Sequence, residues 1–243
     1  MADYEPRTTT TGFGSVPRAG GAVVFDAGLR QHMLSIYNYM ASGVLLTGVV
    51  ALLTANSGLA YTFATGPLMW LVALAPLAIV FAMSFGANRF SKTTLQGMYW
   101  AFAVLMGLSL STIFLVYTGG SIAVTFFATA AAFAGLSLWG YTTQKNLSGM
   151  GTFLIMGVVG LLVASIVNMF VQSEPLMYAI SFIGVLIFAG LTAYDTQKLK
   201  EQYAHLRGTE WAGKAVVLGA LNLYLDFINM FLFLLRFMGQ SRN

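Results

Sequence analysis

The stretch Ala220-Leu-Asn-Leu-Tyr-Leu-Asp226-Phe-Ile-Asn-Met-Phe231 places a single acid in the middle of an apolar run. A second apolar run has an acid near its end, in Phe188-Ala-Gly-Leu-Thr-Ala-Tyr-Asp195-Thr-Gln-Lys198. These are the only two acids inside runs long enough to cross a bilayer, where an unpaired charge costs several kcal/mol. Asp195 and Asp226 are therefore the first candidates for functional residues.

The composition indicates an integral membrane protein. Of the 243 residues, 58% are hydrophobic and only 8% are charged, and the mean hydropathy is +0.76. A soluble domain of this length needs more polar surface than this chain can supply. The bilayer is therefore its expected environment.

The charged and metal-binding residues exclude several other classes. The formal net charge is +4, but the basic residues are dispersed through short loops rather than clustered with aromatic residues, so nucleic acid is not an expected partner. The chain has no cysteine and only two histidines, which excludes disulfides and leaves few ligands for a metal cage. No cofactor is expected.

Seven apolar runs predict an all-α, polytopic bundle of seven transmembrane helices. Each run is close to the ~20 residues that a helix needs to cross the hydrocarbon of a bilayer. We place them at 34–55, 67–88, 95–117, 121–142, 150–172, 176–198 and 215–237. The short connections leave no room for a second domain, so residues 23–243 form one domain. Residues 1–22 lack apolar periodicity and are expected to be a disordered cytoplasmic tail.

The distribution of basic residues predicts the orientation. With a cytoplasmic N-terminus, ten of the twelve lysines and arginines face the cytoplasm: Arg7, Arg18, Arg30, Arg89, Lys92, Lys145, Lys198, Lys200, Arg207 and Lys214. Only Arg236 and Arg242 remain on the other side. This positive-inside bias places the N-terminus inside and the C-terminus outside.

The predicted boundaries do not by themselves bring the two aspartates together. Asp195 lies about one turn from the cytoplasmic end of the sixth run, whereas Asp226 lies about eleven residues, or ~17 Å, into the seventh. We expect contact if the seventh helix enters the membrane later, near Leu218, or if a water-filled vestibule reaches down to Asp226. An isolated buried carboxylate is otherwise hard to stabilise.

A polar face surrounds Asp226. Asn222 precedes it by four residues and Asn229 follows it by three, so the three side chains share one helix face and could hydrogen-bond one another or an ion. Tyr194, next to Asp195, supplies a further polar group. Two neighbouring carboxyl groups resist simultaneous ionisation and titrate as a coupled unit, which suits a proton sensor.

The same two carboxylates offer hard oxygen ligands suited to Ca²⁺, with the amides as additional ligands. A simpler interpretation of Asp195 is that it pairs with Lys198 on its own helix or lies in interfacial water. For Asp226 the simpler interpretation is weaker, because an intramembrane acid by default marks a site.

Three segments resemble the Bax inhibitor-1 family, the transmembrane Bax inhibitor motif proteins. They are the two aspartate segments quoted above and the amino-terminal Phe25-Asp-Ala-Gly-Leu-Arg30, continuing to Tyr37-Asn-Tyr-Met40, which is similar to the bacterial members. The resemblance covers residues 25 to 238. It implies a bundle in which the seventh helix is surrounded by the others, and a pair of aspartates that acts as the pH sensor of a calcium leak.

Carried onto this chain, the resemblance assigns the sensor to Asp195 and Asp226. It also implies a basic gating latch at the cytoplasmic end of the second helix, and counting back from Gly107-Leu-Ser-Leu110 matches this latch to Arg89. The latch would pair with an aspartate to close the pore. The second span carries no acid, so the resemblance does not extend to tight binding of Ca²⁺.

Two other classes of function remain. Intramembrane aspartyl proteases resemble this chain at Tyr194-Asp195, but their Gly-x-Gly-Asp is replaced here by Leu223-Tyr-Leu-Asp226, so an enzyme is not expected. The second class is a regulator of stress response, cell death or a membrane-bound protease, which would act by binding a membrane protein through the N-terminal tail.

Overall fold

A computed structural model of the chain describes residues 27–242. Within this range the chain forms helices and short connections, with one isolated bridge between Tyr117 and Ser241. The helices, in order, are α1 (Ala27–Asn56), α2 (Leu59–Ala64), α3 (Leu68–Gly86), α4 (Lys92–Leu110), α5 (Ile113–Val116), α6 (Gly119–Thr142), α7 (Ser148–Val171), α8 (Glu174–Leu206) and α9 (Trp211–Met238). The predicted tail and the boundary at residue 22 lie outside the described residues.

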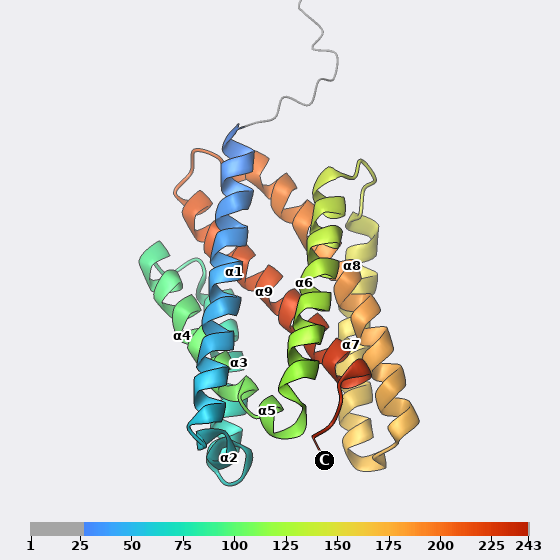
Figure 1. Ribbon diagram of the computed structural model, residues 1–243. Coiled ribbons are helices and arrows are strands. Elements are labelled where there is room, and N and C mark those ends of the chain that lie inside the picture. Colours follow the sequence, from blue (N-terminus) through green and yellow to red (C-terminus); the bar gives the residue numbers. More distant parts are fainter. Residues whose placement is uncertain (1–26, 243) are drawn as a thin grey trace, which may run out of the picture.

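Seven of these segments are long and apolar enough to span a membrane, as the sequence predicts. The third span is α4 continued by α5, with a break at Ser111 and Thr112. The short helix α2 lies in the connection between the first two spans (Figure 1). Neither the break in the third span nor the helix α2 was expected. Hydropathy averaged over a window detects apolar stretches, but it does not show where the backbone of such a stretch leaves the helical conformation.

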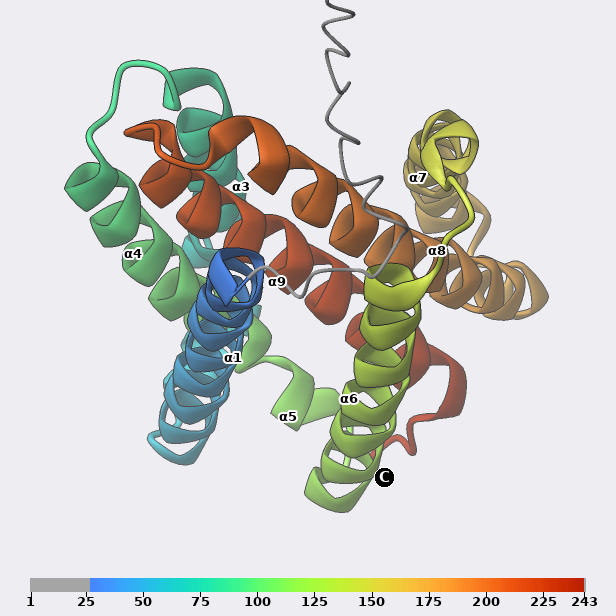
Figure 2. The same cartoon turned by 90° about the horizontal axis from the view of Figure 1, so that it is seen from above.

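The last helix, α9, lies at the centre of the bundle. Seen from above, it is surrounded by α1, α4, α6 and α8, while α3 packs on α4 and α7 packs on α8 at the periphery (Figure 2). In its most apolar stretch 61% of the residues are buried, more than in any other span described. The prediction of a central seventh helix is therefore confirmed.

Close backbone approach fixes the position of α8 against its neighbours. Gly140 of α6 lies directly on the backbone of Ala193 in α8, and a Cβ atom at this glycine would overlap the Ala193 carbonyl oxygen. On the other face of α8, a Cβ at Gly184 would meet the ring of Phe233 at 2.6 Å. Small residues let transmembrane helices pack closely in the absence of a hydrophobic driving force.

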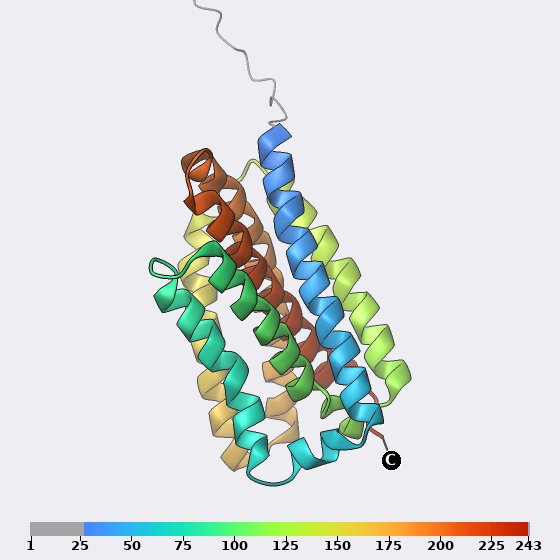
Figure 3. The same cartoon turned by 90° about the vertical axis from the view of Figure 1, so that its left-hand side faces the viewer.

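The segment after α9 folds back onto the turn between α5 and α6. Thr118 N donates to Gln240 O at 3.1 Å, and Arg242 N donates to Val116 O at 2.8 Å. Figure 3 shows this end of the chain on the side of the bundle opposite to the start of α1. The described end of the chain is thereby anchored to the transmembrane domain.

Candidate functional site

The carboxyl groups of Asp195 and Asp226 are in hydrogen-bonding contact across the interface between α8 and α9. Asp226 is only 4% exposed, and its Oδ2 atom has no hydrogen-bond partner among the described residues. Asp195 is half-buried. Two carboxyl groups can form a hydrogen bond only when at least one of them carries a proton, because ionised carboxylates are acceptors alone.

The contact arises because α8 extends further than its apolar run. The helix ends at Leu206, eight residues beyond the predicted limit of 198, and α9 begins at Trp211 rather than later. Asp195 therefore lies eleven residues from the end of α8, or about 17 Å along it, and Asp226 lies about 23 Å from the start of α9. The length of α8 brings the two side chains to a similar depth, while entry of the seventh helix into the membrane near Leu218 and the water-filled vestibule stay predictions.

Aromatic residues beside Asp226 in the sequence pack α9 against α6 and α4. Phe227 contacts the rings of Phe126 and Phe133 from α6, each with a centroid separation of 5.6 Å. Tyr224 is fully buried against Phe102 of α4, at 4.9 Å between ring centroids. α9 is thus packed on α4 and α6 by aromatic side chains on either side of Asp226, and Asp195 is the titratable group that acts on Asp226.

The two asparagines lie on a more exposed face of α9. Asn222 is exposed, and Asn229 is half-buried with its Nδ2 donating to the carbonyl of Leu225 at 2.8 Å. Neither amide hydrogen-bonds to Asp226 in this structure. Asn222, Asp226 and Asn229 thus have the spacing expected of one helix face. The carboxyl group of Asp226 is directed toward α8, however, whereas the two amides lie away from the contact with Asp195.

Tyr194 and Lys198 lie on the side of α8 that faces α7. Gly151 of α7 leaves space for the Tyr194 ring, which a Cβ at that glycine would overlap. The Lys198 Nζ lies 5.8 Å from the centre of that ring, and its charge also acts on Asp195. The simpler interpretation of Asp195 was that it interacts with Lys198. Lys198 does act on Asp195, and Asp226 acts on Asp195 as well.

Arg89 lies in the connection between α3 and α4 and is exposed. This connection is held to the start of α9 by Lys214, whose Nζ donates to Ala87 O at 3.4 Å. Asp226 is twelve residues further along α9 than Lys214, or about 18 Å. Arg89 therefore lies at the same end of the bundle as the loop between α8 and α9, and it is not an electrostatic partner of either aspartate in this arrangement.

Sequence reasoning missed a buried polar contact two residues before Asp226. The Thr47 hydroxyl of α1 donates to Ala103 O at 2.8 Å and lies 2.7 Å from the Tyr224 hydroxyl. Because a threonine hydroxyl has one hydrogen, Tyr224 is the donor in the second bond. These three groups link α1, α4 and α9, and no short-range pattern marks them because Thr47 and Tyr224 are 177 positions apart.

Comparison with known proteins identifies the family. A sequence model of the family described as "Inhibitor of apoptosis-promoting Bax1" matches residues 29–243. The chain belongs to the Bax inhibitor-1 family. The resemblance predicted from the aspartate segments is therefore confirmed.

Relatives in this family match the chain over nearly its whole length. The inner membrane protein YbhL of Escherichia coli is 44% identical, over 93% of this chain and 98% of its own. A protein of Caulobacter vibrioides is 45% identical over 94% of this chain and 96% of its own, and RP147 of Rickettsia prowazekii is 43% identical over the full length of both. The chain thus matches bacterial proteins over nearly their whole length, and one of them is an inner membrane protein.

Proposed function

We propose that this Bax inhibitor-1 family protein is a pH-regulated calcium leak channel of the bacterial inner membrane. The observation that carries the proposal is the contact between the Asp195 and Asp226 carboxyl groups inside two spanning helices. The contact needs a shared proton. Loss of that proton places two negative charges side by side in a poorly solvated interface, which is unfavourable until they separate, bind a cation or become hydrated.

Arg89 supplies the second part of the mechanism. In alkaline conditions an ionised aspartate attracts Arg89, which closes the cytoplasmic end of the pathway as a latch. In acidic conditions the aspartates share a proton and Arg89 is released. Contact between the aspartates and an exposed Arg89 are the features that a released latch would require.

Calcium is the transported ion rather than a tightly held cofactor. Ionised Asp195 and Asp226 offer the oxygen ligands that Ca²⁺ prefers, and Asn222 and Asn229 offer amide oxygens on the neighbouring face. No group of three or more acidic, histidine or cysteine residues suited to a metal occurs among residues 27–242. A weak site with few charged ligands suits an ion that must leave as readily as it enters.

We favour a transport protein over an aspartyl protease because of the residues before Asp226. Leu223 and Tyr224 are both fully buried, so they give a peptide substrate no close approach to the carboxyl group. A glycine at these positions would allow such an approach.

The test is Ca²⁺ entry into dye-loaded liposomes that carry the purified protein, over about pH 5 to about pH 8. We expect the flux to rise with acidification, and we expect Asp195→Asn and Asp226→Asn to alter its pH profile. Arg89→Gln should raise the flux at alkaline pH, whereas Lys145→Gln, which removes an exposed charge from another connection, should not.

The opposite outcome is equally clear. Rates equal to those of protein-free liposomes at every pH would exclude the leak. They would favour the alternative of a regulator that binds another membrane protein. Neutral aspartate variants would then retain function, and deletion of residues 2–22 would abolish it.

A further inference from the structure

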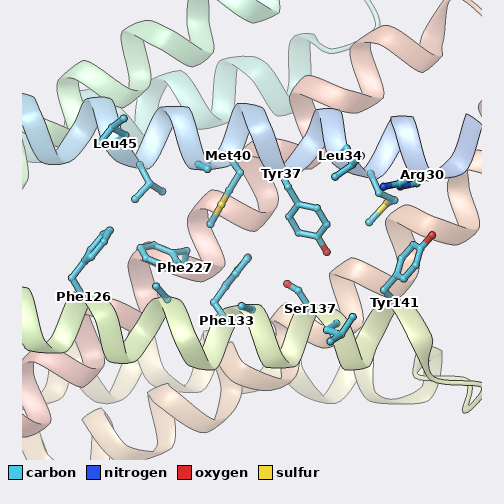
Figure 4. A pocket seen from close by; sticks show the side chains of 16 residues that line it. Arg30, Leu34, Tyr37, Met40, Leu45, Phe126, Phe133, Ser137, Tyr141 and Phe227 are labelled. Carbon is cyan, nitrogen blue, oxygen red and sulfur yellow. The ribbon is translucent and has the colours of Figure 1, made fainter. Parts of the chain in front are cut away.

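A groove of about 690 Å³ runs between α1 and α6, and Phe227 of α9 forms part of its floor. Figure 4 shows its two walls, with Met40 and Leu45 on α1 facing Phe126 and Phe133 on α6. Both walls belong to membrane-spanning helices. The groove therefore lies at the depth of the hydrocarbon, apart from the carboxyl contact, since neither Asp195 nor Asp226 lines it.

The groove has one polar end. Arg30, Tyr37, Ser137 and Tyr141 lie toward the end where α1 begins and α6 finishes, whereas the other end is lined by apolar residues (Figure 4). Arg30 is in the first turn of α1 and Tyr141 is in the last turn of α6. This end therefore lies at the membrane surface, where lipid headgroups are found.

A second cation lies behind the polar end. Lys200 of α8 donates from Nζ to the carbonyl of Tyr141 at 2.7 Å, and its Nζ lies 5.7 Å from the centre of the Tyr141 ring. Arg30 is exposed and lines the groove. Positive charge beside tyrosine and serine hydroxyls matches a phosphate group, which accepts hydrogen bonds and carries a negative charge.

The groove opens sideways toward the lipid. Three leucines on its walls, Leu34, Leu45 and Leu138, are 48%, 69% and 65% exposed. From Arg30 to Leu45 the groove follows fifteen residues of α1, or about 22 Å. This length equals about half of a bilayer that measures ~40–45 Å with its headgroups, so the groove is as long as one lipid leaflet is thick.

We propose that the groove between α1 and α6 binds one anionic phospholipid. The phosphate lies beside Arg30 and Tyr141, and an acyl chain runs past Met40 toward Phe126. A lipid with one charged end and an apolar body matches both the polar end and the apolar remainder.

The test uses native mass spectrometry of the full chain in detergent, with dioleoyl phosphatidylglycerol or dioleoyl phosphatidylcholine as the added probe. The two lipids have the same acyl chains and differ in net charge. We expect one phosphatidylglycerol to be retained in preference to phosphatidylcholine. Arg30→Gln should reduce that preference about tenfold, corresponding to the loss of one charge-assisted contact, and Arg30→Lys should restore part of it.

Two controls separate the groove from the rest of the surface. Lys145→Gln removes an exposed charge that does not line the groove and should leave the preference unchanged. Ala134→Phe fills the groove and should abolish retention of both lipids, whereas Ala132→Phe, at an exposed position outside the groove on α6, should not. Thermal unfolding without added lipid checks that each variant is folded.

Three results would overturn the proposal. One is equal retention of the two lipids by the unchanged chain. The second is an undiminished preference in folded Arg30→Gln. The third is a dimer that Ala134→Phe dissociates, which would assign the groove to a second copy of the chain.

Discussion

The Asp226 carboxyl group, buried at the centre of α9, has the carboxyl group of Asp195 as its hydrogen-bonding partner. The two groups come from helices that are adjacent in sequence and antiparallel in space (Figure 1). Two carboxyl groups in contact are expected to titrate as a pair rather than one by one.

The pair is expected to release its protons in two separate steps, because the first negative charge opposes the second. Infrared spectroscopy of the carboxyl C=O band during a pH titration measures this directly. Asp195→Asn or Asp226→Asn should each leave a single step. Two steps that persist unchanged in either variant would show that the groups titrate independently.

Gly140→Ala is expected to destabilise the protein by about 1–3 kcal/mol, the usual cost of overpacking. The added methyl group would overlap the Ala193 carbonyl and push α6 away from α8. Unfolding in detergent measures the difference in free energy. Gly135→Ala, on the same helix with nothing within 4 Å of the new Cβ, should be neutral or slightly stabilising. Equal effects of the two substitutions would contradict the close contact.

The bond between Thr47 and Tyr224 predicts an asymmetry between two isosteric changes. Tyr224→Phe leaves Thr47 still donating to Ala103 O and should cost about 0.6 kcal/mol, a typical value for such bonds in membranes. Thr47→Val leaves a buried tyrosine hydroxyl without its partner and should cost about 1–3 kcal/mol. The double variant should cost less than the sum of the two. Additive effects measured in the same unfolding assay would argue against the bond.

The orientation can be tested with single cysteines, because the chain contains none. If the N-terminus is cytoplasmic, an impermeant maleimide should label Ser241→Cys in intact cells or spheroplasts and should label Lys145→Cys only after lysis. Both positions are exposed. The reverse labelling pattern would mean that the positive-inside interpretation is wrong for this chain.

The number of spans and the all-α class could be predicted from sequence because they follow from apolar length and residue pattern. The central position of α9 was expected only from the resemblance to the Bax inhibitor-1 family. The end of α8 could not. Its last turns, from Lys198 to Leu206, carry charged and polar residues. The hydropathy falls there, so the apolar run ends at Lys198, although the backbone hydrogen bonds of the helix continue to Leu206.

The candidate site was predictable in its residues but not in its contacts. Asp195 and Asp226 are visible because intramembrane acids are rare. Their direct contact depends on where two helices end, and the inward turn of Asp226 away from Asn222 depends on how α8 packs on α9. The bond between Thr47 and Tyr224, and the groove on α1 and α6, depend on residues far apart in the chain, which local patterns do not connect.

The Asp226 Oδ2 atom, which is buried and has no hydrogen-bond partner among the described residues, has a consequence for how the bundle can change shape. Any movement that parts α8 from α9 takes the Asp195 carboxyl group away from this buried atom, and only water or an entering cation can then satisfy it. The helices can therefore separate only as water enters the interface between them. A protein that conducts in this way has no dry intermediate, and its rate of opening should depend on the activity of water as well as on that of protons.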